Sequence, residues 1–154
     1  MDAAESLGPT WMARLVEVLQ PLSLHADRLA ATELFAGVGR PDLELAAGIL
    51  TDVLVDRGTR MTVQGQPTAR LWLILEGQAL VSVDARPIRV AANGDLVGLG
   101  SMLKGATSPE TTIALSPIRA FEADAGRLRQ LMALRSVRAR LMAAASTRRH
   151  SGFT

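Results

Sequence analysis

The chain has 154 residues, no Cys, two His and a formal net charge of +2 at pH 7. This length suits one domain with helical flanks. The lack of Cys excludes disulfides, thiolate catalysis and cysteine zinc sites, and the wide separation of His25 and His150 argues against a histidine-based metal site. No apolar run reaches the ~18 residues of a transmembrane segment, and the N-terminus lacks the basic start of a signal peptide. We therefore expect a cytoplasmic protein.

The first 50 residues carry apolar side chains at helical spacing. This spacing predicts a helix over 11–20, which Pro21 ends, and a second helix over about 24–36. A third, short helix is predicted to start at Pro41, because proline is well suited to the first turn of a helix. The N-terminal part is therefore expected to be helical.

From Thr51 the spacing of apolar residues changes to two. Glycines and Asp-containing turns separate these segments, and many short strands with regular turns predict a sandwich or a barrel. The alternating apolar positions are Val53, Val55, Met61, Val63, Leu71, Leu73, Leu75, Val81, Val83, Ile88 and Val90, followed by the segments 113–115 and 118–121.

Residues 94–113 have the layout of a glycine-led turn, a short helix, a polar loop and a return strand, and we call this segment the cassette. Backbone N–H groups at such a helix start can hold an anion. We interpret Asp95 as a residue that orders the turn.

Trp72 is interpreted as a core or interface anchor. It alternates out of phase with Leu71 and Leu73, which makes it a candidate to face solvent or a partner.

The C-terminal part returns to good helix formers, and a long helix is predicted over 124–145. Residues 1–124 have a charge balance of −5, whereas residues 125–154 hold seven Arg and no acid. A mildly acidic body therefore carries a basic tail. The last nine residues, 146–154, are expected to be frayed.

The order of the glycine motifs is the most specific signal in the chain. In sequence they read Leu34-Phe35-Ala-Gly-Val, Gly58, Gln64-Gly65-Gln-Pro, Leu71-Trp-Leu-Ile-Leu-Glu-Gly77 and Gly94-Asp95-Leu-Val-Gly98. This pattern resembles the cyclic nucleotide-binding domain family over about residues 30–145.

The resemblance implies an α+β, mainly β fold: a β-roll, that is, a double-stranded β-helix jelly roll, with N-terminal helices and a long C-terminal helix. The implied division is 1–33 for the N-terminal helices, 34–125 for the β-roll, 126–145 for the C-terminal helix and 146–154 for a flexible basic tail. Gly58, Gly65 and Gly77 are expected at sharp turns with positive φ.

The cassette departs from the family pattern at its charged positions. In the family the residue after Gly98 is usually Glu, which binds the ribose hydroxyl, and here it is Leu99. The phosphate-binding Arg of the family aligns with Glu110 or Pro109, and no Arg occurs from Val90 to Ile118. Lys104 is the sole cation in the cassette, and we expect it to point to solvent.

Three interpretations of the cassette stay open at this point. It is an active nucleotide site, or a remnant that the fold keeps for packing, with Leu99 and Met102 plugging the pocket, or a site for a less charged ligand held by Ser101, Thr111, Thr112 and backbone amides. The candidate ligand-binding residues are Gly98, Leu99, Gly100, Ser101, Met102, Thr111 and Thr112.

The function that we favour is a non-enzymatic regulatory or interaction module without a cofactor, because no nucleophile–base pair, metal cluster or carboxylate pair marks a catalytic site. The alternatives are a genuine receptor for cAMP or cGMP with an atypical cassette that uses Lys104, and a regulatory subunit or fused domain of an enzyme or transporter.

The C-terminal helix has two interpretations. Either its apolar arc covers the β-roll, or it also binds a partner, and the width of the arc favours a homodimer or a protein partner. Arg135 and Arg138 intrude on this arc and argue against a simple coiled coil. Sequence-specific DNA binding is not expected, because only nine residues follow Ala145.

Overall fold

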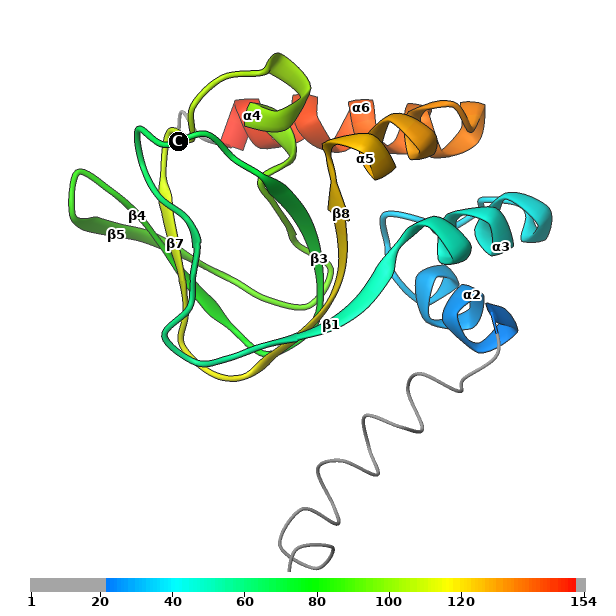
Figure 1. The fold of residues 1–154 in the computed structure, drawn as a ribbon, viewed down its shortest axis with the longest axis horizontal. Helices are drawn as coiled ribbons and strands as arrows, with labels where there is room; N and C mark the ends of the chain where they lie inside the picture. The colour runs from blue at the N-terminus through cyan, green and yellow to red at the C-terminus, as the bar shows by residue number, and fades with distance from the viewer. Residues whose placement is uncertain (1–21, 152–154) are drawn as a thin grey trace, which may run out of the picture.

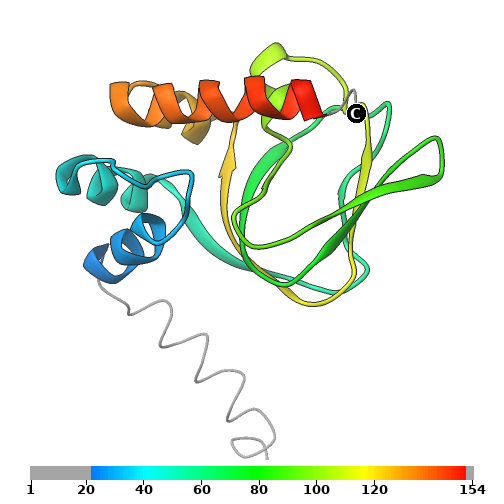
Figure 2. The same ribbon diagram turned by 180° about the vertical axis from the view of Figure 1, so that it is seen from behind.

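A computed structural model describes residues 22–151, so the helix predicted over 11–20 lies outside the described residues. The described chain forms two four-stranded sheets with the helices gathered on one side (Figures 1 and 2). The helices are α2 (Leu22–Ala30), α3 (Arg40–Ile49), α4 (Leu99–Lys104), α5 (Ala125–Met132) and α6 (Arg135–Ser151). The strands are β1 (Thr51–Val55), β2 (Arg60–Thr62), β3 (Arg70–Glu76), β4 (Ala79–Val83), β5 (Arg86–Ala91), β6 (Leu96–Val97), β7 (Thr111–Ala114) and β8 (Ile118–Asp124).

The first sheet has the strand order β1-β8-β3-β6 and the second has the order β2-β7-β4-β5. All pairings are antiparallel. The two sheets form a mainly β roll that has helices before and after it, as the sequence predicts. Gly58, Gly65 and Gly77 have the expected positive φ, at 87°, 82° and 99°. At Gly77 a Cβ atom would lie 2.4 Å from the carbonyl oxygen of Pro117, so the turn excludes any other residue.

Apolar side chains from both sheets pack between them, and we call this cluster the roll core. Its central strand is β3, which is buried on both faces because Trp72 and Ile74 face the roll core while Leu71 and Leu73 face the helices. Trp72 is therefore a core anchor, and the expectation that it faces solvent or a partner is wrong. The buried members are Val55, Met61, Trp72, Ile74, Ala79, Val81, Ala91, Val97, Ala114, Ile118 and Ala120.

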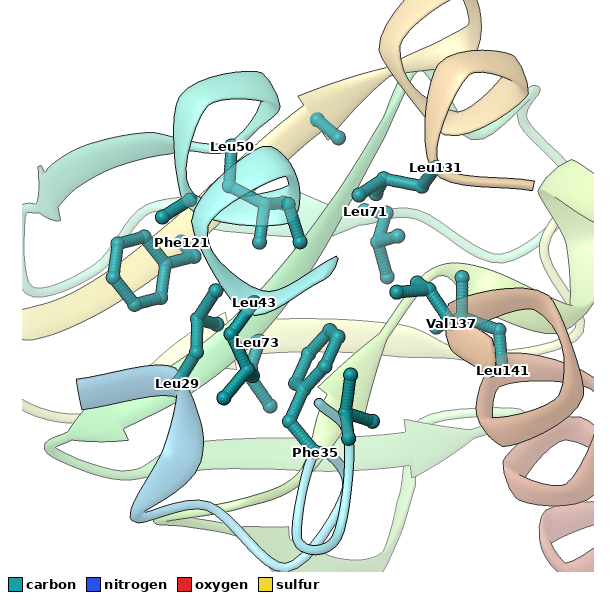
Figure 3. Close-up of a cluster of buried hydrophobic side chains, with 14 of the residues drawn as sticks. Leu29, Phe35, Leu43, Leu50, Leu71, Leu73, Phe121, Leu131, Val137 and Leu141 are labelled. Carbon is teal, nitrogen blue, oxygen red and sulfur yellow. The ribbon is translucent and has the colours of Figure 1, made fainter. Parts of the chain in front are cut away.

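A second cluster, the helix-side core, lies between the helices and the outer face of the first sheet (Figure 3). Phe35, before α3, and Phe121 on β8 are its largest members, and each is at most 2% exposed. Val137 and Leu141 of α6 close it from the other side. The N-terminal and C-terminal helices are thus parts of one packed layer.

Two helices differ from their predicted bounds. The helix predicted over about 24–36 ends at Ala30, and the chain continues in turns in which the N–H of Thr32 bonds to Leu29. The long helix predicted over 124–145 is two helices. The break at Ala133 is a tightened turn, because the N–H of Leu134 bonds to the carbonyl of Leu131, three residues back. Helix α6 then continues to Ser151.

Across the described range 22–151, the structure contains no helix with the length and apolar character needed to cross a bilayer.

Candidate functional site

The cassette has the predicted layout, and backbone geometry fixes its start. Gly98 follows β6 and caps α4 in the left-handed conformation, with φ 93°. A Cβ atom at this position would lie 2.6 Å from the carbonyl oxygen of Arg70, so only glycine fits. The carboxylate of Asp95 accepts the N–H of Ala92 at 2.8 Å, which confirms that Asp95 orders the preceding turn.

Leu99 and Met102 face away from the roll interior. Leu99 is 2% exposed and belongs to the helix-side core, and Met102 packs against the same cluster. The structure thus places these two side chains against the helices, and their role as a plug of a nucleotide pocket stays a hypothesis. Helix α4 docks on β3 and α6, and this docking buries the face that carries Leu99.

Ser101 and Gly100 complete the first turn of α4. Ser101 is buried, and its hydroxyl lies 2.7 Å from the hydroxyl of Thr68 and 3.4 Å from the carbonyl of Gly98. Gly100 is exposed. The Ser101 hydroxyl is thus engaged within the protein.

The two threonines of the return strand are also engaged. The Thr111 hydroxyl accepts the N–H of Gln64 at 3.0 Å. Thr112 is fully buried, and its hydroxyl lies 3.0 Å from that of Thr62 on β2. These bonds join the return strand to β2 and the residues after it. The structure therefore does not bring the predicted site residues together: Leu99 and Met102 pack in the helix-side core, whereas Thr112 is buried on the inner face of the second sheet.

Glu110 forms an ion pair between the cassette and β5. Its two carboxylate oxygens accept hydrogen bonds from Nη2 of Arg89 at 2.9 and 3.1 Å. The side chains are 20% and 35% exposed, respectively. One of the two positions expected to align with the phosphate-binding Arg of the family, Glu110, thus holds a carboxylate that Arg89 of β5 neutralises. Lys104, at the end of α4, is exposed as expected.

Arg89 is the residue that the sequence analysis missed. It lies one position before the Arg-free segment from Val90 to Ile118. A signal was present, because residues two apart on a strand share a face and Ala91 is a buried member of the roll core. The same alternation places Arg89 on the inner face, while the next residue, Val90, is exposed on the outer face.

A second polar group borders the roll core near the cassette. The indole N–H of Trp72 donates to Glu122 at 2.9 Å, and Arg70 contacts the other oxygen of the same carboxylate at 3.1 Å. Glu122 thereby satisfies the polar atom of a buried Trp and is itself neutralised. Its carboxylate is a structural group and leaves no free charge for a ligand.

A cavity of about 220 Å³ lies elsewhere, between α2 and the first sheet. It is lined by Arg28, Ala31, Thr32, Leu75, Glu76, Asn93 and Arg119. Its wall includes the end of β3 and Asn93, the residue before the cassette. Gly98, at the start of α4, lies against Arg70 at the beginning of β3. The cavity therefore borders the first turn of the cassette and is not lined by α4.

The β-roll with a turn–helix–strand cassette defines the class of cyclic nucleotide-binding folds. A sequence profile described as "cyclic nucleotide-binding domain" matches residues 53–135. The chain belongs to this family. A search of curated protein sequences finds no significant match.

Solved structures give the same class. A mutant form of the cAMP-binding acyltransferase from Mycobacterium smegmatis is 27% identical, with a TM-score of 0.66, over 84% of this chain and 42% of that one. The regulatory domain of Toxoplasma gondii PKA, crystallised with cAMP, is 17% identical, with a TM-score of 0.71, over 82% of this chain and 50% of that one. The Thermus thermophilus catabolite activator protein is 20% identical, with a TM-score of 0.68, over 77% of this chain and 59% of that one. The chain thus spans about two fifths to three fifths of these proteins.

Proposed function

We propose that this protein is a non-enzymatic regulatory or interaction module of the cyclic nucleotide-binding fold that does not bind cyclic nucleotides in the usual way. The observation that carries this proposal is the Arg89–Glu110 pair, with contacts of 2.9 and 3.1 Å, at one of the two positions expected for a phosphate-binding Arg. The paired charges cancel, so the site offers no net positive charge to a phosphodiester.

Electrostatics supports the proposal. Two like unit charges 4 Å apart repel by about 4 kcal/mol at an effective dielectric constant near 20. Arg89 offsets this repulsion for a phosphate beside Glu110, but the pair then supplies no net attraction to compensate the hydration that the phosphate loses. Leu99, buried in the helix-side core, supplies no acceptor for a ribose hydroxyl. The interactions available to a cyclic nucleotide are therefore weak or repulsive.

Isothermal titration calorimetry with cAMP and cGMP tests the proposal. We expect no binding heat from the wild-type protein at up to millimolar nucleotide. A micromolar dissociation constant for either nucleotide would overturn the proposal. Titration with 5′-AMP serves as the ligand control, because it carries the same base without the cyclic phosphodiester.

The second candidate function is a genuine cAMP or cGMP receptor with an atypical cassette. The observation that favours it is the 27% identity to a protein described as a cAMP-binding acyltransferase. The exposed Lys104 would have to supply the cation in this case. Binding that disappears in the Lys104→Ala variant would support this candidate, and binding that this variant retains would exclude that role for Lys104.

The same similarity favours a third candidate, a domain that works with an enzyme, since this chain matches only 42% of the acyltransferase chain. Co-purification of the tagged protein with an enzyme or transporter from native extract would support it. Recovery of the tagged protein alone would argue against it.

We also propose a cytoplasmic homodimer or hetero-complex that forms through α6 and does not bind specific DNA sequences. Val137 and Leu141 face the helix-side core, whereas Met142 of the same helix is 49% exposed. Analytical ultracentrifugation of the wild type and of the Met142→Glu variant tests this. We expect the variant to shift a dimer toward monomer, and a wild-type monomer at all concentrations would exclude the homodimer.

A further inference from the structure

The inner face of the second sheet carries a row of four residues from four strands. The strand register pairs Arg89 with Val81, Val81 with Thr112, and Thr112 with Thr62. Val81 and Thr112 are fully buried, and their neighbours Ala91 and Ala114 belong to the roll core. Arg89 therefore stands at the end of a row directed into the roll.

Arg89 is the one half-buried cation among the described strand residues of the second sheet. Arg60 and Arg86 are exposed. Strand alternation places Arg60 on the face opposite to that of the buried Met61. The register shift in β5 pairs Arg86 with Val83, so Arg86 shares the face of Arg89 but lies at the exposed turn between β4 and β5. An anion that approaches the inner face of this sheet would thus meet the guanidinium of Arg89.

The contact between Arg89 and Glu110 leaves the guanidinium partly unused. One nitrogen, Nη2, donates to both carboxylate oxygens. The two-nitrogen fork that makes Arg–carboxylate pairs strong is not formed. Within the described chain, Nε and Nη1 of Arg89 have no hydrogen-bond partner, so they can bind a further acceptor.

The backbone of Glu110 is fixed independently of its carboxylate. The Glu110 carbonyl accepts a hydrogen bond from the Ser108 hydroxyl at 2.6 Å, and the Thr62 hydroxyl lies 3.1 Å from it. The carboxylate, in contrast, contacts Arg89 alone among the described residues. Rotation of this side chain would release Arg89 and leave the loop in place.

We infer that Arg89 is the anchor of an anion site for phosphate-bearing ligands and that the carboxylate of Glu110 is its built-in occupant. This inference rests on the proposed function, because it explains the lack of cyclic nucleotide binding by an internal competitor. A ligand or partner that removes the Glu110 side chain from Arg89 would open the site. Glu110 thereby determines whether the cassette accepts an anion.

The test compares four full-length proteins by calorimetry with inorganic phosphate and with cAMP. They are the wild type, Glu110→Ala, the double variant Arg89→Met with Glu110→Ala, and Glu44→Ala. The last is a matched control, because it removes the same charge from an exposed ion pair on α3. We expect Glu110→Ala to bind phosphate at least tenfold more tightly than the wild type, and the double variant and Glu44→Ala to match the wild type.

Two results would overturn the inference: a folded Glu110→Ala protein that binds phosphate no better than the wild type, or a gain that persists after Arg89→Met. Circular dichroism melting establishes folding. If Glu110→Ala does not fold, Glu110→Gln replaces it, and a gain below threefold then overturns the inference. The same experiment separates the two claims. If the wild type binds cAMP and Glu110→Ala still gains phosphate affinity, the proposed function is refuted and the inference is not. If the wild type does not bind cAMP and Glu110→Ala gains no phosphate affinity, the inference is refuted and the proposed function is not.

Discussion

Two arginine–carboxylate clusters in this protein contain similar groups but differ in burial and in charge balance. Beneath α2, one oxygen of Asp52 contacts Arg28 at 3.0 Å and Arg119 at 3.1 Å, and the Asp52 side chain is 7% exposed. At the cassette, Glu110 faces Arg89 alone, and the two side chains are 20% and 35% exposed. The first cluster connects α2 to β1 and β8. In the second, Glu110 contacts one nitrogen of the Arg89 guanidinium and leaves the other two nitrogens available.

Removal of the central carboxylate beneath α2 should have the largest effect. The Asp52→Ala variant removes a carboxylate that is 7% exposed and leaves the guanidinium groups of Arg28 and Arg119 close to each other, so we expect a loss of about 3 kcal/mol or more in the free energy of unfolding. Urea denaturation measures this. The control is Glu44→Ala, whose exposed pair with Arg40 should contribute less than about 0.5 kcal/mol. Equal losses would remove the distinction between buried and exposed clusters.

The cassette should depend on apolar packing more than on its charges. Leu99→Ala removes a side chain that is 2% exposed in the helix-side core, and we expect a loss of about 3 kcal/mol by urea denaturation. Leu54→Ala, at a 54% exposed position, is the control and should change stability by less than about 0.5 kcal/mol. Calorimetry should show no cAMP binding by Leu99→Ala. New binding would mean that Leu99 does block a nucleotide pocket.

Substitution of Gly98, at the start of α4, should lower stability by a smaller amount, through a steric clash. Gly98 and Gly58 both have positive φ, at 93° and 87°, but a Cβ atom at Gly58 meets no atom within 4 Å. We expect Gly98→Ala to lower the free energy of unfolding by about 2 kcal/mol, and Gly58→Ala by about 1 kcal/mol, because only the former adds a clash to the backbone strain. Similar melting temperatures for the two variants would show that the contact with the Arg70 carbonyl is relieved without cost.

The sequence predicted the roll because its signals are local. Apolar alternation and the turn glycines are properties of neighbouring residues, and Asp95 orders its turn within three residues. The side chains that decide the site depend on tertiary contacts. Glu110 meets Arg89 across 21 residues, and Leu99 is buried because of how α4 docks. The break at Ala133 has no Gly or Pro to signal it.

The smallest effect is expected at the cassette pair. A double-mutant cycle with Arg89→Met and Glu110→Ala measures the coupling free energy of the two side chains by urea denaturation. We expect less than about 1 kcal/mol, because both side chains are partly exposed and a single guanidinium nitrogen makes the contact. A coupling near 3 kcal/mol would make the pair a structural element like the cluster beneath α2. A weak coupling means that Glu110 can leave Arg89 at little cost, which is the property that an internal competitor for an anion requires.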